Sequence, residues 1–320
     1  MDVRSALREA IARLRAAQVP SHTLAAELLL MHARGCDRTW LYSHPEERLD
    51  PLVAEKYFSL VARRADGEPA QYLTGKQGFW DLEFEVTPAV LIPRPETEHV
   101  IEVALTRLGA RGIKTRLDTG APSTRLRVAD VGTGSGCIAV ALARELPDAE
   151  IFATDISAAA LDVAQRNATR HGVSDRIHFF ECDLLGAFLG FDSLPVGVWH
   201  GVPELSSKQA PFDLIVSNPP YVARDEAVQL PREVRKHEPD VALFGGPTGA
   251  RIYKRLIEQA GTLLRPGGLL VLELGYNSWE HVNGLFNAQR GWTNISITND
   301  LAGIPRVLAG ERGRQQLSRV

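Results

Sequence analysis

The sequence predicts an α/β protein whose mostly parallel β-sheet carries helices on both faces, preceded by a small α-helical domain. Three observations support this fold class. From Leu126 onward, short apolar runs alternate with amphipathic segments, which is the strand-then-helix order of a parallel sheet. The apolar runs are continuous, as expected of strands buried on both faces. Before position 72 only helical spacing occurs, and a short segment of period two separates the two regions.

Length and composition fit a globular protein of about two domains. The chain has 320 residues, of which 44% are hydrophobic and 23% charged. Its net charge of −3 gives no overall positive field that would attract nucleic acid, so direct DNA binding is not expected.

Cysteines and apolar runs indicate the compartment. Cys36, Cys137 and Cys182 lie far apart, and neither they nor the histidines show metal-ligand spacing, so reduced thiols and no metal are expected. No apolar run approaches the ~20 residues of a membrane span. The first residues lack the apolar core of a secretory signal. A cytoplasmic protein without a membrane partner is predicted.

Residues 1–72 are predicted to form the helical domain. An apolar stripe at helical spacing runs from 3 to 14, Ser21 is expected to cap a second helix that passes Met31, and a third helix begins near Pro51. The segment contains no catalytic constellation. It is either a packing unit or a recognition module for a macromolecule.

Residues 73–92 are predicted to be a β-hairpin linker, because Leu82, Phe84 and Val86 alternate with acidic residues. The next segment, Leu91-Ile-Pro-Arg-Pro-Glu-Thr-Glu98, is stiffened by two prolines. We expect it to open a helix at Pro95 or Thr97 and to line one wall of the active site.

The remaining elements follow from the alternation of apolar runs and amphipathic segments. Strands are expected at 126–131, 150–155, 176–181, 213–217 and 269–274, with two shorter ones at 294–298 and 306–309. Helices are expected at 136–146, 158–171 and 249–264. Two long polar segments, 109–125 and 186–211, are expected to be loops.

A glycine-rich loop follows the first of these strands. The segment from Asp130 to Cys137 reads Asp-Val-Gly-Thr-Gly-Ser-Gly-Cys and leads into a helix. Glycines let a backbone turn tightly and approach a ligand at a helix N-terminus. The spacing departs from the G-x-G-x-x-G fingerprint, so this loop alone indicates either a ligand site or a structural turn.

Two acidic residues stand at the ends of the next strands. Asp155 ends the second strand, where a carboxylate can accept both ribose hydroxyls of a nucleoside, and Ser157 is available to cap the following helix instead. Asp183 occupies the corresponding place after the third strand. It could accept from an adenine amino group or serve as a helix cap.

The segment Asn218-Pro219-Pro220-Tyr221 ends the fourth strand abruptly. Both prolines fix their own φ, and each residue before a proline is pushed toward an extended conformation. The result is a stiff turn that holds one carboxamide, free carbonyls and an aromatic ring where ligands bind in open α/β sheets. Such a turn suits a planar amino or amide nitrogen.

Together these features resemble the class I S-adenosylmethionine (SAM)-dependent methyltransferases that act on planar nitrogens. More narrowly, the chain resembles the HemK/PrmC-type protein-(glutamine-N5) methyltransferases, which modify the GGQ glutamine of peptide chain release factors. The resemblance rests on the helical N-terminal region, the segment 91–98, the glycine loop, the turn 218–221 and the segment 300–306. It implies a Rossmann-like methyltransferase domain at 93–320 and a substrate-recognition role for 1–72.

The resemblance also implies roles for individual residues. The expected cofactor residues are Asp130, Gly132, Thr133, Gly134, Ser135, Gly136, Asp155, Asp183, Leu184 and Asn218. The expected catalytic residues are Asn218, Pro219 and Tyr221, and the expected substrate-binding residues are Asn218, Pro219, Pro220, Tyr221, Arg94 and Glu96. The family often has tryptophan where this chain has Leu184.

The implied reaction converts S-adenosyl-L-methionine to S-adenosyl-L-homocysteine without a metal. An amide nitrogen is a weak nucleophile, so oxygens of Asn218 and Pro219 that accept its two N–H bonds would orient it and favour positive charge on it. Tyr221 would pack on the amide. The expected partner is a release factor, and the protein is expected to be a monomer.

Three alternatives remain open from the sequence. A glutamine methyltransferase of a ribosomal protein would share the same site. A DNA adenine or cytosine amino-methyltransferase could use the same turn on a flipped base, although the chain lacks basic clustering. A noncatalytic nucleoside-binding protein would not be expected to keep both Asn218 and Asp155.

Overall fold

The computed structural model describes residues 1–110, 126–189 and 212–313. The predicted loops 109–125 and 186–211 lie almost entirely outside these ranges. Within the described ranges, no helix is long and apolar enough to span a bilayer.

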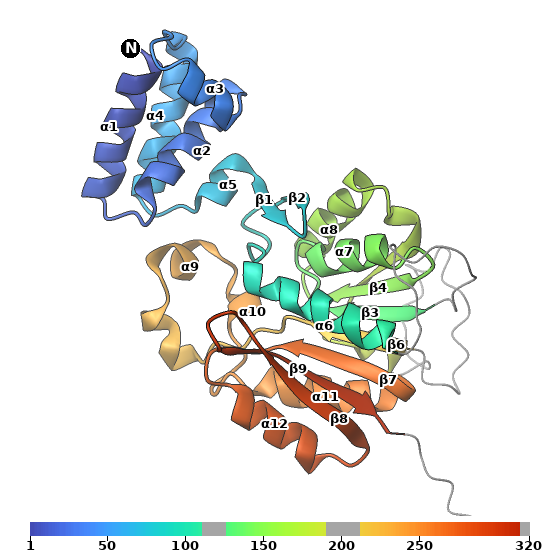
Figure 1. Cartoon of the computed structure of the whole chain (residues 1–320). Helices are drawn as coiled ribbons and strands as arrows, with labels where there is room; N and C mark the ends of the chain where they lie inside the picture. The colour runs from blue at the N-terminus through green and yellow to red at the C-terminus, as the bar shows by residue number, and fades with distance from the viewer. Residues whose placement is uncertain (111–125, 190–211, 314–320) are drawn as a thin grey trace, which may run out of the picture.

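The N-terminal region is a helical bundle with its own core (Figure 1). Its helices are α1 (Val3–Ala16), α2 (His22–Arg34), α3 (Arg38–Ser43), α4 (Pro51–Ala65) and α5 (Ala70–Thr74). The short helices α3 and α5 were not predicted, because five or six residues carry too little periodicity to detect. The domain boundaries at 72 and 92 remain predictions.

The prediction that Ser21 caps α2 is wrong. Ser21 immediately precedes the helix, but its backbone is left-handed, with φ of 49°, and its side chain makes no capping hydrogen bond. A capping hydroxyl needs an extended backbone to reach back to the first turn. The side chains that do cap in this region are Asp2, Asp37 and Asp50.

The linker is the predicted hairpin. Strands β1 (Lys76–Phe79) and β2 (Leu82–Glu85) pair antiparallel, with Phe79 opposite Leu82. The two turn residues, Trp80 and Asp81, both have positive φ, which is the geometry that matches the twist of a two-residue hairpin.

The large sheet has seven strands in the order β5-β4-β3-β6-β7-β9-β8. Strands β3 to β7 run parallel, and β9 runs antiparallel to both its neighbours. Their bounds are β3 Arg127–Val131, β4 Glu150–Asp155, β5 Ile177–Glu181, β6 Phe212–Ser217, β7 Leu264–Glu273, β8 Trp292–Asn299 and β9 Pro305–Arg312. The predicted fold class is confirmed. Strand β7 begins earlier than predicted, because its pairing with β6 continues across an irregularity near the Pro-Gly-Gly that resembles a stop signal.

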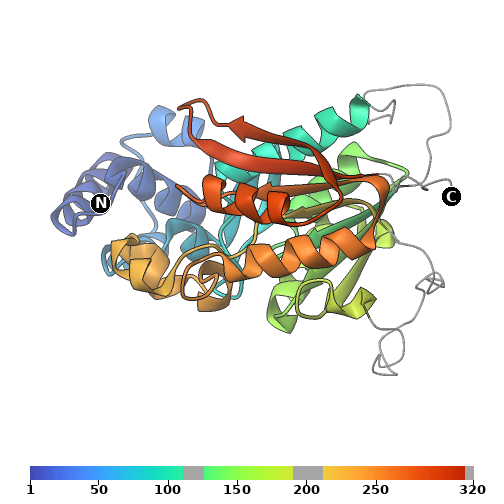
Figure 2. The same cartoon turned by 90° about the horizontal axis from the view of Figure 1, so that it is seen from below.

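Helices cover both faces of this sheet (Figures 1 and 2). One face packs against α6 (Glu98–Gly109), α7 (Cys137–Glu145) and α8 (Ala158–Arg170). The other packs against α11 (Arg251–Leu263) and α12 (Trp279–Ala288), of which α12 was not predicted. Neighbouring strand residues serve opposite faces, as Val128 and Ala129 do. Two short helices, α9 (Arg232–His237) and α10 (Asp240–Leu243), lie between β6 and α11.

The strand register places one polar row along the carboxyl edge of the sheet. Val131 of β3 is level with Thr154 of β4 and with Ser217 of β6, which is level with Leu272 of β7. The next residue along each strand lies at the edge itself. In the spatial order β4, β3, β6 and β7, these residues are Asp155, Gly132, Asn218 and Glu273. The chain leaves β3 for β4 on one side and returns through β6 on the other, so the ligand crevice of an open α/β sheet is expected here.

Candidate active site

A cavity of about 470 Å³ opens at this edge. Predicted residues that line it are Gly132, Thr133, Gly134, Ser135, Asp155, Asp183, Leu184, Asn218 and Pro220. The segment 91–98 lines one wall of the cavity through Leu91, Pro93 and Thr97, as predicted. Residues that the sequence did not single out also contribute: Ala89 and Val90 of the linker, Ile156, and Asp240 to Ala242 with Phe244. The cavity has the size of a small-molecule site.

The glycine loop turns from β3 into α7 beneath this cavity. Gly134 has φ of 55°, and its amide donates to Asp155 Oδ2 at 2.9 Å. Gly136 has φ of 79°, and a Cβ there would lie 3.0 Å from Ala164 Cβ in α8. Gly136 therefore allows α7 and α8 to approach, while Gly134 joins the loop to the acid of the neighbouring strand.

Asp155 keeps part of its carboxylate acceptor capacity for a ligand. Its two oxygens accept from the amides of Gly134 and Ser157, each at 2.9 Å, and a carboxylate has about four acceptor sites. Burial raises its pKa, although these backbone hydrogen bonds oppose the shift. The Ser157 hydroxyl caps α8 by accepting from Ala160, as predicted.

Asp130 lies fully buried at the base of the loop and does not line the cavity. Its Oδ2 accepts from the Thr133 hydroxyl at 2.6 Å and from the Ala139 amide at 3.1 Å. No described residue hydrogen-bonds its Oδ1, and burial raises its pKa to about 7. Asp130 therefore holds the glycine loop from below and does not reach the cavity.

The residues after β5 form the far end of the cavity. Asp183 is exposed, and its Oδ2 pairs with Arg255 Nη2 at 2.7 Å, so only part of its carboxylate remains for an adenine amino group. Leu184 lines the cavity with a left-handed backbone, φ 55°. Ile156, which follows Asp155, adds apolar surface to the cavity lining, and Phe244, which pairs with Val222 just after the turn, adds more.

Asn218 is held from behind by a residue of the proline-rich segment. Its Nδ2 donates to Thr97 Oγ1 at 3.0 Å, and Thr97 Oγ1 in turn donates to Glu273 Oε2 at 2.6 Å. No described residue donates to the carboxamide oxygen of Asn218. Thr97 was predicted to open a helix within a segment that lines the site. It does line the cavity, but its hydroxyl makes no capping bond and contacts Asn218 and Glu273 instead.

Glycines surround the rest of the turn. A Cβ on Gly245 would lie 2.5 Å from the Pro220 carbonyl oxygen, and one on Gly275 would lie 2.6 Å from Tyr221 Cδ2. A Cβ on Gly249 would come closer still to the Tyr221 carbonyl oxygen. The glycines of this cradle were not predicted as part of the site, although the cluster Gly-Gly-Pro-Thr-Gly at 245–249 was a signal for a close approach of the backbone.

Six predicted site residues lie outside the cavity lining: Asp130 and Gly136, described above, and four residues of the turn and the proline-rich segment. Pro219 is buried and Tyr221 packs on Gly275. Arg94 makes two hydrogen bonds of 2.7 Å to the carboxylate of Glu238, and Glu96 is half-buried. Burial raises the pKa of Tyr221, so its phenol is neutral. The substrate roles of these residues remain predictions.

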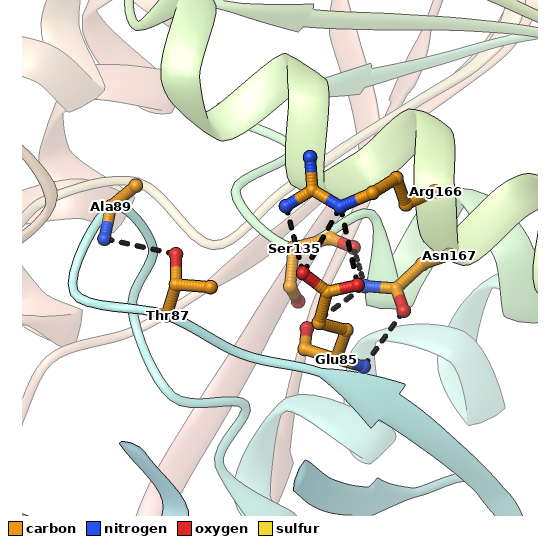
Figure 3. Close-up of polar contacts among 6 residues, drawn as sticks. All are labelled: Glu85, Thr87, Ala89, Ser135, Arg166 and Asn167. Carbon is orange, nitrogen blue, oxygen red and sulfur yellow. Dashed lines mark hydrogen bonds and ion pairs between the residues drawn. The ribbon is translucent and has the colours of Figure 1, made fainter. Parts of the chain in front are cut away.

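Asn167 of α8 ties the linker to the glycine loop (Figure 3). Its Oδ1 accepts from the Glu85 amide at 2.8 Å, and its Nδ2 donates to the carbonyls of Glu85 at 3.0 Å and Ser135 at 2.9 Å. Arg166 adds an exposed ion pair to Glu85. These contacts fix the strand from which residues 89–91 reach the cavity.

In the three described ranges, no three His, Cys, Asp or Glu side chains gather as metal ligands. The fold and this edge define the class of the protein. A mostly parallel seven-stranded sheet, a glycine loop after β3 and an acid at the end of the adjacent β4 form the SAM-dependent methyltransferase fold.

Comparisons with known proteins agree with this class. The family model of the PrmC N-terminal domain matches residues 5–75, and that of a methyltransferase domain matches residues 128–237. The solved hMettl16 catalytic domain in complex with the MAT2A 3′UTR hairpin 6 has a TM-score of 0.51 and 18% identity. The match covers 78% of this chain and 81% of that one, and it shows the fold alone.

Curated relatives give the family. A release factor glutamine methyltransferase of Koribacter versatilis is 43% identical over 98% of this chain and 99% of its own length. Another release factor glutamine methyltransferase, of Moorella thermoacetica, is 41% identical over 98% of this chain and 99% of its own length. The chain belongs to the release factor glutamine methyltransferase family, as the sequence analysis expected.

Proposed function

We propose that this protein transfers a methyl group from SAM to the side-chain amide nitrogen, N5, of the glutamine in the GGQ motif of peptide chain release factors. The placement of the Asn218 side chain is the observation that supports this proposal most strongly. Its carboxamide stands at the cavity rim, anchored through nitrogen by Thr97, with its oxygen free to accept an amide N–H.

The cavity supports binding of SAM. Asp155 would hold the ribose, the backbone from Gly132 to Gly136 the methionine part, and Asp183 with Leu184 the adenine region. SAM supplies an electrophilic methyl group and leaves as S-adenosyl-L-homocysteine. No role for a metal is proposed.

The turn prepares the acceptor nitrogen. When Asn218 Oδ1 and the Pro219 carbonyl accept its two N–H bonds, the nitrogen is oriented and its developing positive charge is stabilised. Pro220 contributes cavity wall, and Tyr221 braces the turn against Gly275. Arg94 would act from the edge of the site, where it neutralises Glu238, with Glu96 on the same segment.

The partner we propose is the release factor itself, docked in part by the helical region 1–72, with the enzyme acting as a cytoplasmic monomer. A glutamine of a ribosomal protein is the second candidate acceptor, because the turn reads only a primary amide. Direct action on DNA is not proposed for a chain with a net charge of −3.

A methyl-transfer assay decides among the acceptors. Purified protein and labelled SAM are incubated in parallel with release factor, ribosomal proteins and DNA. Label on release factor is expected. Label confined to either of the other two would refute the proposed substrate.

A further inference from the structure

The contact behind Asn218 bears on how its carboxamide is oriented, and the inference rests on the function proposed above. We propose that Thr97 is a positioning residue that, together with Glu273, fixes which end of the Asn218 carboxamide faces the acceptor glutamine. None of the site residues expected from the sequence includes this pair.

Three elements bring the groups together. Glu273 ends β7 and stands beside Asn218 in the polar row, because Leu272 is level with Ser217. Thr97 comes from the segment before α6 and lies between them, with contacts of 3.0 Å to Asn218 Nδ2 and 2.6 Å to Glu273 Oε2. Thr97 and Glu273 are each 2% exposed, so water does not compete for these contacts.

The direction of each hydrogen bond follows from the number of hydrogens. A threonine hydroxyl has one hydrogen and two lone pairs, and an ionised carboxylate can only accept. The Thr97 hydrogen is therefore committed to Glu273. Toward Asn218 the hydroxyl can only accept, so it selects the amide nitrogen of Asn218 and turns the carboxamide oxygen the other way.

The opposite orientation would defeat the chemistry. An Asn218 that presents its NH₂ group would place two donors against the N–H groups of the acceptor glutamine. Such a pair cannot form the hydrogen bonds that orient the nitrogen or stabilise its positive charge. The Thr97 contact therefore fixes which end of the Asn218 carboxamide faces the acceptor, as well as where the carboxamide lies.

The charge state of Glu273 controls this arrangement. Burial raises its pKa to about 7, the Thr97 hydrogen bond and the nearby Arg94 and Arg306 lower it, and Glu96 raises it. The phenols of Tyr221 and Tyr253 lie close by, and Tyr253 donates to the backbone carbonyl of Glu273. A protonated Glu273 could donate to Thr97, whose own hydrogen would then be released toward Asn218. We expect kcat to rise with pH through about 7.

The first test compares Thr97→Val with Thr97→Ser. Valine keeps the shape and removes the hydroxyl, so kcat for release factor should fall about 10- to 100-fold, the scale of a misplaced reacting group. Affinity for SAM, measured by calorimetry, should stay within about threefold because the hydroxyl does not hold SAM. Serine keeps the hydrogen bonds and should retain most of kcat.

The second test is the pH profile of kcat in the wild type and in Glu273→Gln. The wild type should show an inflection near pH 7. The glutamine variant, which does not titrate, should lose the inflection and have a lower, flat kcat. An unchanged inflection in Glu273→Gln would overturn the proposal.

The outcomes separate this inference from the proposed function. Wild-type protein that fails to methylate release factor contradicts the proposed function. Wild-type protein that is active while Thr97→Val keeps full kcat contradicts the positioning role alone. A Thr97→Val protein that loses SAM affinity in parallel with kcat also contradicts it, because the loss then reflects the shape of the cavity.

Discussion

The Asn218 carboxamide is held by a turn that has little freedom to move. Pro219 and Pro220 restrict the backbone on one side, and Gly245 and Gly275 allow other chain segments to close against it. A rigid support of this kind is what orientation of a weak nucleophile requires, since small displacements cost rate.

Asn218→Ala removes the acceptor oxygen at the centre of this account. We expect methylation to fall below detection, while SAM affinity changes by no more than several-fold, because other residues make up most of the cavity. Asp155→Ala is the matched counterpart and should weaken SAM binding in calorimetry. Full methylation by Asn218→Ala would contradict the mechanism.

Gly275→Ala tests the glycine cradle. An alanine Cβ would lie 2.6 Å from Tyr221 Cδ2, so Tyr221 and the turn must shift. We expect kcat to fall about 10- to 100-fold. Gly284→Ala in α12, where a Cβ meets no atom within 4 Å, is the control and should leave kcat unchanged. Equal kcat in the two variants would show that the cradle has no role.

Glu273 should also affect stability, with a defined sign. Its pKa is raised in the folded protein from 4.5 to about 7, so folding favours the protonated form. The stability that the protonated Glu273 contributes to the folded protein is fully present below about pH 4.5 and is lost as the pH rises through about 7. As the pH is raised from 5 to 8, the free energy of unfolding of Glu273→Gln should therefore rise relative to that of the wild type by roughly 1–3 kcal/mol. Urea unfolding at the two pH values measures this change. A difference that does not change with pH would contradict this.

At the residue scale, the sequence identifies those parts of the site that lie within one short segment. Gly132 to Gly136 and Asn218 to Tyr221 are recognisable because their chemistry is local. Thr97 lies 121 residues from Asn218 and 176 residues from Glu273 along the chain, so only the folded structure brings the three together.

At the scale of elements, the linker and α8 act as one unit. Asn167 bonds the backbone of β2 and the Ser135 carbonyl of the glycine loop, so it couples the linker wall to the cofactor side of the cavity. It is completely buried.

Asn167→Ala should weaken SAM binding about 10-fold or more, because it leaves buried backbone groups unpaired at about 1–3 kcal/mol each. Arg166→Ala is the control in the same helix, and it removes only an exposed ion pair to Glu85. Calorimetric titration with SAM measures both. Equal affinities in the two variants would mean that the Asn167 bridge is not needed for the site.

Long regular elements were predictable and irregular ones were not. The predicted strand 150–155 coincides with β4, because a continuous apolar run ends there in an acid. The cavity wall at Asp240 to Ala242 was missed, since a helix as short as α10 has no readable period.

At the scale of the whole molecule, the helical region is fastened to the methyltransferase domain near α9. Arg64 of α4 is largely buried and pairs with Glu233 of α9 at 2.5 Å. Figure 1 shows the bundle on the side of the domain where α9 lies. This ion pair joins the proposed recognition region to the domain that carries the site.

Glu233→Gln should raise KM for a full-length release factor several-fold and leave KM for a short GGQ peptide unchanged, because a peptide reaches only the cavity. Arg63→Gln, which breaks an exposed pair with Glu68 inside the linker end of the bundle, is the control. An equal rise in KM for both substrates would contradict a docking role.

Mass spectrometry of the modified release factor shows which side chain receives the methyl group. Release factor is incubated with SAM and the wild-type protein, digested, and fragmented across the GGQ segment. We expect a gain of one methyl group on the side chain of that glutamine, absent with Asn218→Ala. A methyl group on any other residue, or none, would contradict it.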